Sequence, residues 1–505
     1  MSDSLRLLWS ALPAELRLII LNNLAEEPAE HKYQRSAYTV VCKEWQHFFE
    51  PVLFRRLILH QSDVKKMGEI VRDDRIAYVK WVWLRFELPP YDCTHCEEHG
   101  FPEENQRYNQ LFTNAVWELF AILRSWGPRG RGGGITLELS AHSPSDALHH
   151  YKPLQRRIHD TAWAWKQNRP GEGQRYHDPK HGWESTRRTI PQRGALERLF
   201  VPWDGLKFDR RASFARKLKR LPRVTIINTI YIRRQFLRRF SAAFALSTIF
   251  QSTPAVTDFR YEPWFEPCFM SYQDYNFLLS DVFKRAKHLK RISIYESCSG
   301  FLHEMHRHHP SSVLGRALEQ SSFDLEGLHI GKVLDSRDFF YRFWPCDETG
   351  YEIQSNRRER KWEQLRSLSF SSVYLNPLGI DNLMSAASSA AMMMPRLEIM
   401  ELWIGITGNM CIFRYRRRAD SIKIELLSTR HARITSRMEK QWARVAEYHN
   451  SRVNMEVENI DVDPGQIKGE ACILQYLVCQ HMLLNEVSLL QIQEEFQELA
   501  SYPSQ

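Results

Sequence analysis

The sequence has little of what builds fibres, disulfide scaffolds or membrane spans. Glycine and proline number 22 and 23 in 505 residues, far below the content of collagen-like or low-complexity chains. The nine cysteines are an odd count without a framework spacing, which favours reduced thiols in a cytoplasmic or nuclear protein. The most apolar late stretch, residues 471–492, contains Gln, His, Asn and Glu. It therefore predicts a buried helix pair rather than a membrane span of about 20 apolar residues.

The composition is that of a globular protein, with 43% hydrophobic and 26% charged residues. The chain is too long for one ordinary core of about 100–200 residues, so it has several domains or one repetitive domain that grows by stacking. The start has an early acidic residue and no basic region, which excludes a signal peptide. The net charge of +9 permits an acidic or nucleic-acid partner, but a mild solvated surface bias is the simpler explanation.

Two amphipathic helices are expected near the start. Leu16, Ile19, Ile20 and Leu24 recur at steps of three and four, which places them on one helix face. Pro13 suits the first turn of that helix. A second stripe predicts another helix that ends at the proline after it: Tyr38, Val41, Cys42, Trp45, Phe48 and Phe49, then Pro51. The alternating run at 54–59 predicts a first strand.

These residues resemble an F-box. The sequence LPAEL at 12–16 and the stripe that follows it match the first helix of that motif, and VVCKEW at 40–45 matches a Val-Cys-x-x-Trp element of a later helix. The run from Trp45 to Pro51, with a Phe-Arg-Arg-Leu strand after it, resembles F-box proteins common in filamentous fungi. We assign residues 8–60 to the F-box.

The resemblance implies that this unit docks on the Skp-family adaptor of a cullin ligase complex. A helical unit of about 40 residues cannot bury so many apolar groups by itself, and a surplus apolar face is what a partner covers. Packing of the same side chains on the rest of this chain is the alternative. The adaptor-binding residues carried over from the family are Leu12, Pro13, Leu16, Ile20, Leu24, Val41, Cys42 and Trp45.

The middle of the chain repeats the pattern apolar-x-x-apolar-x-apolar. Chance alone would give roughly 40 matches at this composition, so the even spacing and the helix-like gaps between copies carry the prediction. Those gaps are 233–251, 274–289, 309–321 and 376–397. The copies begin at Leu196, Leu221, Val256, Leu289, Leu325, Leu365 and Leu397, with an earlier weak copy at Tyr78 and a strand at 135–139.

This α/β pattern over residues 61–410 resembles an irregular leucine-rich-repeat-like solenoid, which often follows an F-box and forms its substrate-binding surface. The steps between copies exceed the usual ~20–29 residues, and the signature Asn is mostly missing, so an ordinary α/β domain remains the alternative. Residues 141–194 are polar, basic and punctuated by Gly and Pro. They predict a long, partly mobile surface insertion.

The last residues, 411–505, are expected to form a C-terminal α+β cap. Residues 411–429 alternate like a hairpin of exposed strands, a helix covers 436–450, and a strand and turn cover 455–465. The apolar helix pair near 472–496 ends the chain. A solenoid needs such a cap to cover its last apolar face.

No catalytic motif is present. The sequence has neither a phosphate-binding G-x-x-x-x-G-K-[ST] loop nor a G-x-S-x-G elbow. The pair Cys93-x-x-Cys96 with His99 lacks a fourth zinc ligand, and the cluster at His303, His306, His308 and His309 is better explained as a polar loop. Two basic runs could meet phosphates, although a solvated face is favoured for both: Arg233-Arg234…Arg238-Arg239, expected on an amphipathic helix, and Arg416–Arg418.

We therefore expect a non-catalytic protein without cofactor or metal. The leading hypothesis is the substrate-recognition subunit of an SCF-type cullin–RING E3 ubiquitin ligase, in which the repeat region binds an unknown target protein. The second is a non-catalytic interaction scaffold that acts outside the ligase. The third is an enzyme with an unrecognised site, which predicts a deep pocket holding groups of perturbed pKa.

Overall fold

The computed structural model describes most of the chain. The described residues are 9–26, 36–92, 94, 102–127, 133–149, 177–181, 183–184, 187–188, 205–212, 220–234, 238–264, 270–296, 312–345, 360–406, 408–418, 421–430, 432–449, 454–467 and 469–500.

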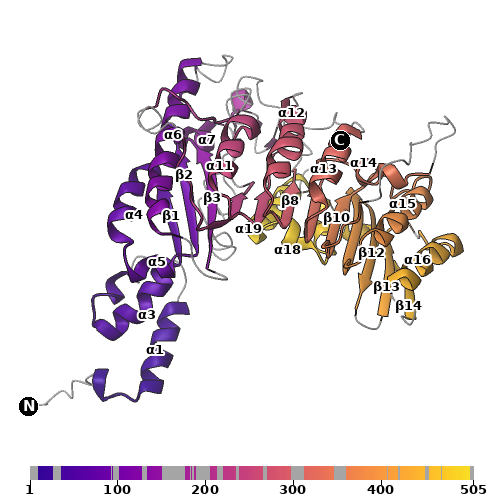
Figure 1. The fold of residues 1–505 in the computed structure, drawn as a ribbon, viewed down its shortest axis with the longest axis horizontal. Helices are drawn as coiled ribbons and strands as arrows, with labels where there is room; N and C mark the ends of the chain where they lie inside the picture. Colours follow the sequence, from indigo (N-terminus) through magenta and orange to yellow (C-terminus); the bar gives the residue numbers. More distant parts are fainter. Residues whose placement is uncertain are drawn as a thin grey trace, which may run out of the picture.

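One open sheet of twelve strands runs through the molecule, and its strands follow one another in chain order (Figure 1). Neighbours from β1 to β11 are parallel, β11–β12 and β12–β13 are antiparallel, and β13–β14 is parallel. The strands are β1 Arg56–His60, β2 Trp81–Glu87, β3 Ile135–His142, β6 Ile227–Ile232, β7 Asp258–Tyr261, β8 Arg291–Tyr295, β9 Gly327–Gly331, β10 Ser367–Ser371, β11 Ile399–Ile406, β12 Asn409–Arg417, β13 Ser421–Ser428 and β14 Asn454–Asp461.

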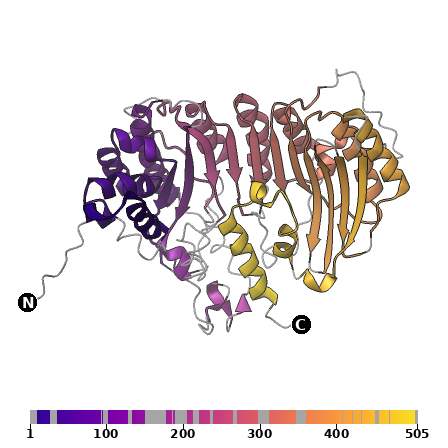
Figure 2. The same cartoon turned by 90° about the horizontal axis from the view of Figure 1, so that it is seen from below.

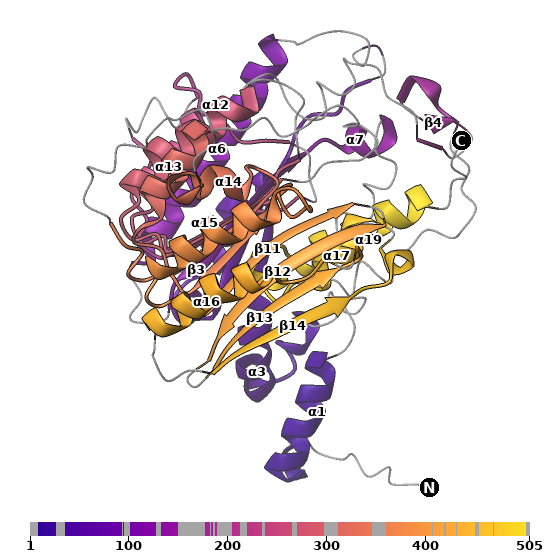
Figure 3. The ribbon, with the colours of Figure 1, turned by 90° about the vertical axis from the view of Figure 1, so that its right-hand side faces the viewer.

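Helices between the strands cover one face of the sheet, and the last three helices lie on the opposite face (Figure 2). The first group is α4 Val64–Ile70, α5 Asp74–Tyr78, α6 Pro102–Ser125, η7 Ala242–Leu246, α11 Ser247–Ser252, α12 Met270–Phe277, η8 Leu278–Phe283, α13 Ser312–Ser322, α14 Ser336–Phe339, α15 Ile380–Met392 and α16 Ser436–His449. Helix α7 Pro144–His149 does not belong to this group, since Figure 3 shows it on the side of the sheet away from α12 and α13. The C-terminal helices are α17 Glu470–Leu474, α18 Gln480–Leu483 and α19 Glu486–Ala500.

The remaining elements are short or lie at the N-terminus. Helices α1 Ala14–Glu26 and α3 Lys43–Phe54 project from the sheet (Figures 1 and 3). Short pieces are η1 Trp9–Ala11, η3 Gln61–Asp63, η6 Pro179–His181, η9 Tyr341–Phe343, η10 Pro464–Gln466 and the two-stranded β4 Trp183–Glu184 and β5 Arg187–Arg188.

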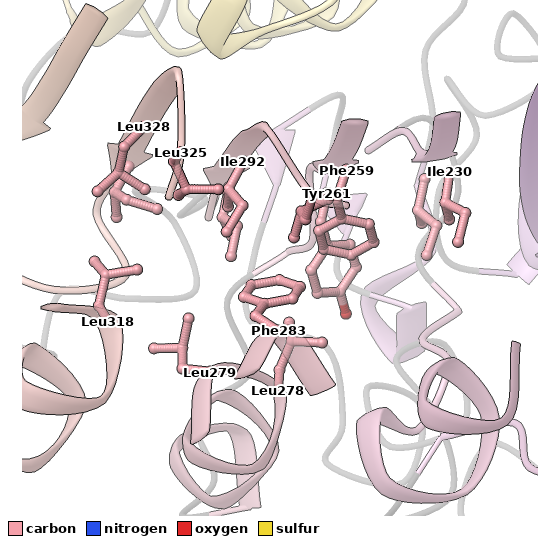
Figure 4. Packing of buried hydrophobic residues seen from close by; sticks show 14 of the residues in the cluster. Ile230, Phe259, Tyr261, Leu278, Leu279, Phe283, Ile292, Leu318, Leu325 and Leu328 are labelled. Carbon is pink, nitrogen blue, oxygen red and sulfur yellow. The ribbon is translucent and has the colours of Figure 1, made fainter. Parts of the chain in front are cut away.

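The main core lies between the sheet and the covering helices. Alternate strand residues point to this face, and their register forms a continuous apolar row: Ile230, Phe259, Ile292, Leu328, Leu368 and Met400, all buried. Figure 4 shows Leu278, Leu279 and Phe283 of η8 packed toward this row. Truncating one such side chain to Ala costs about 2–5 kcal/mol.

A repeated main-chain contact fixes how each strand meets the next. The two residues at the start of a unit donate their N–H groups to one carbonyl of the unit before it. Lys290 and Arg291 donate to Thr257, Glu326 and Gly327 to Lys290, Arg366 and Ser367 to Glu326, and Glu398 and Ile399 to Arg366. The side chains at these positions pair as well, with Lys290 Nζ 2.7 Å from Glu326 Oε1.

Five of the predicted repeat strands are confirmed, since β7 to β11 lie on the patterns that begin at Val256, Leu289, Leu325, Leu365 and Leu397. The strand at 135–139 and the strand at 54–59 are also present as β3 and β1. The helices expected at 274–289, 309–321 and 376–397 are present too. The copy at Leu196 lies outside the described residues.

Two strand predictions are wrong in detail. The copy at Leu221 ends at Ile226, one residue before β6 begins, because Leu221 and Val224 are buried in an irregular segment that hydrogen-bonds to the end of α11. The copy at Tyr78 predicted the strand β2 correctly but assigned the wrong residues of that strand to the core. Trp81 and Trp83 use their indole N–H groups for Glu138 and Ser140 at 2.8 Å, while Val82, Leu84 and Phe86 enter the core.

The C-terminal strands continue the main sheet. The hairpin at 411–429 is confirmed as β12 and β13, but its strands are largely buried rather than exposed, because α16 covers one face and the C-terminal helices the other. Trp442 of α16 lies 4.9 Å from Phe413, between ring centroids. The predicted helix pair near 472–496 is three helices, α17 to α19.

The insertion predicted at 141–194 is only partly visible. Residues 141–149 complete β3 and form α7, where Asp146 is buried. Apart from 177–181, 183–184 and 187–188, the rest lies outside the described residues, as do Cys93, Cys96, His99 and the histidines at 303–309. Within the part of the chain that the structure describes, no helix is long and apolar enough to cross a membrane.

Candidate partner-binding surfaces

The N-terminal helices are held together by aromatic side chains. Trp45 of α3 contacts Trp9 and Tyr38, with ring centroids 5.1 and 5.6 Å apart. Phe49 is fully buried beside Tyr38 and Trp45. Glu44 accepts a hydrogen bond from Trp9 Nε1 at 2.7 Å and pairs with Arg17 at 3.4 Å. Arg17, the α1 residue among these contacts, lies four positions from the buried Leu21 and so on the same side of the helix.

The other side of α1 carries exposed apolar side chains. Leu16 is 48% exposed, Ile19 54% and Ile20 38%, and their spacing places them on one face of the helix. Val40 and Val41 are exposed in the turn before α3. We call these five residues the N-terminal apolar patch. Exposed apolar side chains grouped on one helix face, as Leu16, Ile19 and Ile20 are, commonly mark interaction sites.

The eight predicted adaptor-binding residues fall into two groups. Five are exposed: Pro13, Leu16, Ile20, Val41 and Cys42. Leu12, Leu24 and Trp45 are half-buried, and Trp45 packs on Trp9 and Tyr38. The motif did not single out Val40, and it placed Ile19 only in the helix stripe; their exposure in the folded chain is what adds them to the patch.

The second predicted helix differs in its limits. Cys42 is the extended residue before α3, and the helix continues through Pro51 to Phe54. An interior proline lacks the N–H for one helical hydrogen bond and crowds the carbonyl four residues before it. Pro51 lies in the last turn of α3, where few bonds follow it, and the helix continues to Phe54, so the break that the sequence predicted does not occur. The stripe from Tyr38 to Phe49 is therefore split between a short turn and α3.

Helix α3 leads directly into β1, and an ion pair joins it to α5. Arg75 of α5 donates to Glu50 with Nη2 2.7 Å from Oε1, and its guanidinium carbon lies 5.1 Å from the ring centroid of Phe54. Burial raises the pKa of Glu50, but the hydrogen bonds from Arg75 and Gln46 outweigh it, and the pKa lies below its ordinary value. Glu50 is therefore ionised at neutral pH.

The opposite face of the sheet carries polar side chains, and we call it the polar face. The strand register forms one row across it: Trp83, Glu138, Tyr231, Arg260, Ser293, His329, Ser369, Glu401, Arg414 and Glu425. Most of these side chains are buried, because other segments cover them. Loss of hydration on burial lowers the pKa of His329 to about 3, so this imidazole is neutral at physiological pH.

The basic run at 233–239 is not a solvated helix face, which corrects the prediction. Arg233, Arg234, Arg238 and Arg239 are all buried, and the first two directly follow strand β6. Arg233 pairs with Glu138, Arg238 with Asp146 at 2.9 Å, and Arg239 with Glu296 at 3.4 Å. Charged side chains leave water only with such partners. The second run, Arg416–Arg418, is less buried than the first. Arg416 pairs with Glu425 at 2.6 Å, and Arg418 is exposed.

Two buried carboxylates of the polar face hold the C-terminal helices. Glu401 of β11 accepts the N–H groups of Val478 and Cys479 at 3.0 and 2.7 Å. Glu262, after β7, accepts the N–H of Asn485 at 2.8 Å. Burial raises the pKa of Glu262, and hydrogen bonds from Ser488, Asn485 and Tyr231 offset this only in part.

Three hollows lie among the described residues, and none of these three is lined by the buried Glu262 or His329. Their volumes are about 260, 340 and 770 Å³. Cys411 lines the 340 Å³ hollow, and burial raises the pKa of its thiol to about 12. A thiol that stays protonated at neutral pH is a poor nucleophile.

The comparisons with known proteins add one match. Residues 284–485 are similar to a family of unknown function (DUF6546). No curated protein and no solved structure matches the chain. The matched range runs from the end of η8 to Asn485, and so includes strands β8 to β14 and helix α18.

Proposed function

We propose that the chain is the substrate-recognition subunit of an SCF-type cullin–RING E3 ubiquitin ligase. In this function residues 8–60 are an F-box that binds the Skp-family adaptor, and the sheet carries the target in the cytoplasm or nucleus. The observation that carries the proposal is the N-terminal apolar patch. Leu16 and Ile20 are exposed on α1, which projects from the sheet, and Val41 is exposed in the turn before α3.

The finer fold belongs to the same proposal. Strands in chain order, with the same main-chain contact from unit to unit, are typical of a stacked repeat. We propose that residues 61–410 are a leucine-rich-repeat-like solenoid and that residues 411–505 cap it. Such a subunit catalyses nothing itself, since it holds the target near the ubiquitin-charged enzyme and so raises the local concentration of the two reactants.

The test is adaptor binding by the full chain. Leu16→Ala with Ile20→Ala removes apolar area at about 25 cal/mol per Å², and the affinity should fall at least about tenfold, since each 1.4 kcal/mol is a factor of ten. Leu12→Ala with Pro13→Ala should weaken binding too. Leu18→Ala is the matched control, because Leu18 is 52% exposed and lies two positions from Ile20, on another side of α1.

The result separates the hypotheses. Adaptor binding that the patch variants abolish and the control retains supports the ligase subunit. No binding by the intact chain would overturn it and leave the helix pair as ordinary structure. A scaffold outside the ligase would bind adaptor or target without target turnover, so reconstituted ubiquitin transfer decides between these two.

A further inference from the structure

The C-terminal segment 476–488 crosses the polar face from β12 to β7, and Figure 2 shows α18 and α19 on the side of the sheet away from α11 to α13. Among the described residues, at least seven hydrogen bonds join the segment to the sheet. Glu401 and Glu262 accept from the N–H groups of Val478, Cys479 and Asn485 and from the hydroxyl of Ser488. Arg414, Ser293 and Arg260 donate to the carbonyls of Tyr476, Leu483 and His481.

Six of these seven contacts use the main chain of the segment. The sheet therefore recognises a conformation more than a set of side chains. Glu401 binds the N–H groups just before α18, and Glu262 binds the N–H of Asn485, just before α19. The first N–H groups of a helix have no partner within the helix, and a carboxylate is the acceptor that suits them best.

Side-chain selectivity comes from an apolar floor beside the two carboxylates. Tyr295 and Trp403 stack with ring centroids 6.5 Å apart, although two strands separate them. Gly331 makes this possible, because a Cβ at that position would lie 2.5 Å from Tyr295 Cδ2. Leucines of the C-terminal segment, including Leu483, Leu484 and Leu489, pack on this floor.

The segment does not satisfy every polar group beneath it. Ser369 Oγ and Trp403 Nε1 are buried on the polar face, and among the described residues neither has a hydrogen-bond partner. A buried donor without a partner costs about 1–3 kcal/mol. A different occupant that reached these two groups would recover part of that free energy.

We propose that strands β7 to β12 form a recognition surface for a leucine-bearing segment that starts a helix, and that residues 476–489 are its intramolecular occupant. The fitting partner is a target segment of the same chemistry, with free N–H groups for Glu262 and Glu401 and leucines for the floor. This identification of the target class depends on the proposed function. The tethered copy competes at an effective concentration on the order of millimolar.

The experiment weakens the occupant and leaves the surface intact. Leu484→Ala with Leu489→Ala in the full chain removes two leucines of the segment. A labelled peptide of residues 469–500 is then titrated into wild-type and variant chains, and amide exchange of residues 476–488 reports whether the segment has opened. The variant should bind the peptide at least tenfold more tightly than the wild type.

A second opening variant is Gly405→Ala, since a Cβ there would lie 1.5 Å from Ile473 Cδ1 and push α17 away. With either opened chain, adding Glu401→Gln should weaken peptide binding at least tenfold. Glu398→Gln is the matched control, since Glu398 is half-exposed and pairs with Arg366 rather than with the segment.

Three results would overturn the proposal: an opened segment with no peptide binding, equal binding of a scrambled peptide, or a segment whose amide exchange stays unchanged in both variants. The last would make residues 470–500 permanent core. Adaptor binding, measured on the same chains, depends on the N-terminal apolar patch, so failure here and failure of the ligase function give different results.

Discussion

The carboxylate of Glu262 accepts the backbone N–H of Asn485 at 2.8 Å, although the two residues are 223 positions apart. The same carboxylate accepts from Tyr231 Oη at 2.8 Å. One side chain at the end of β7 thus joins strand β6 to the start of α19. Its removal should affect the sheet and the C-terminal segment together.

Glu262→Ala is expected to lower the free energy of unfolding by several kcal/mol, because each buried group left without a partner costs about 1–3 kcal/mol. Glu262→Gln should be much milder, since it keeps an acceptor oxygen for Asn485 and since burial already favours the neutral form of this side chain. Urea unfolding of the two variants checks the difference. An equal loss in both would contradict the assigned contacts.

Acid should destabilise the fold through His329. The pKa of His329 is about 3 in the folded chain, against an ordinary value of 6.5. As the pH falls, the imidazole is therefore protonated in the unfolded chain before it is protonated in the folded one. The stability that the neutral imidazole contributes is present above pH 6.5 and is lost as pH falls toward 3, by about 1.4 kcal/mol per unit. His329→Gln should show a shallower decline in denaturant midpoint between pH 7 and 4.5, whereas His47→Gln, at an exposed position, should follow the wild type.

The paired charges at the strand starts should contribute little individually. Lys290 is half-exposed and 2.7 Å from Glu326, and exposed pairs of this kind are worth about 0.2–1 kcal/mol. Lys290→Glu should destabilise by about that amount, and Lys290→Glu with Glu326→Lys should recover most of it. A double-mutant cycle in low salt measures the coupling, and a coupling near zero would leave only the main-chain contact at this position.

Arg75→Ala should loosen the N-terminal helices without unfolding the sheet. The substitution removes the hydrogen bonds to Glu50 and the contact with Phe54, while the core of β2 to β11 keeps its packing. Faster amide exchange confined to residues 14–54 would be the result expected. Lys65→Ala, at an exposed position of α4, is the control and should leave that exchange unchanged.

The repeated strands could be predicted because their core positions recur at fixed offsets within each unit. Leu289-x-x-Ile292-x-Ile294 predicted β8, since three apolar side chains at these offsets all face the helices. The repeat pattern gave a wrong core assignment where a residue counted as apolar points away from the covering helices. Trp83 is large and apolar in composition, yet it lies on the polar face because its indole N–H reaches Ser140.

The polar face could not be predicted in the same way. Its pairs join residues far apart in sequence, such as Arg233 with Glu138, and a run of arginines has the same composition whether it is solvated or buried. Part of the N-terminal apolar patch was easier to predict, since Leu16 and Ile20 belong to a local helix stripe. Their exposure still depends on which side of α1 packs against α3, and only the tertiary structure shows that.

The fixed contact between strand starts separates repeat length from repeat register. Strands β7 to β11 begin at residues 258, 291, 327, 367 and 399, so their units differ in length, yet each unit meets the carbonyl of the one before it in the same way. The differences in unit length therefore lie in the connecting segments and not at that contact. Connecting segments of the array should therefore tolerate insertion, replacement and grafting of foreign loops, and the sheet could serve as a scaffold of constant pitch.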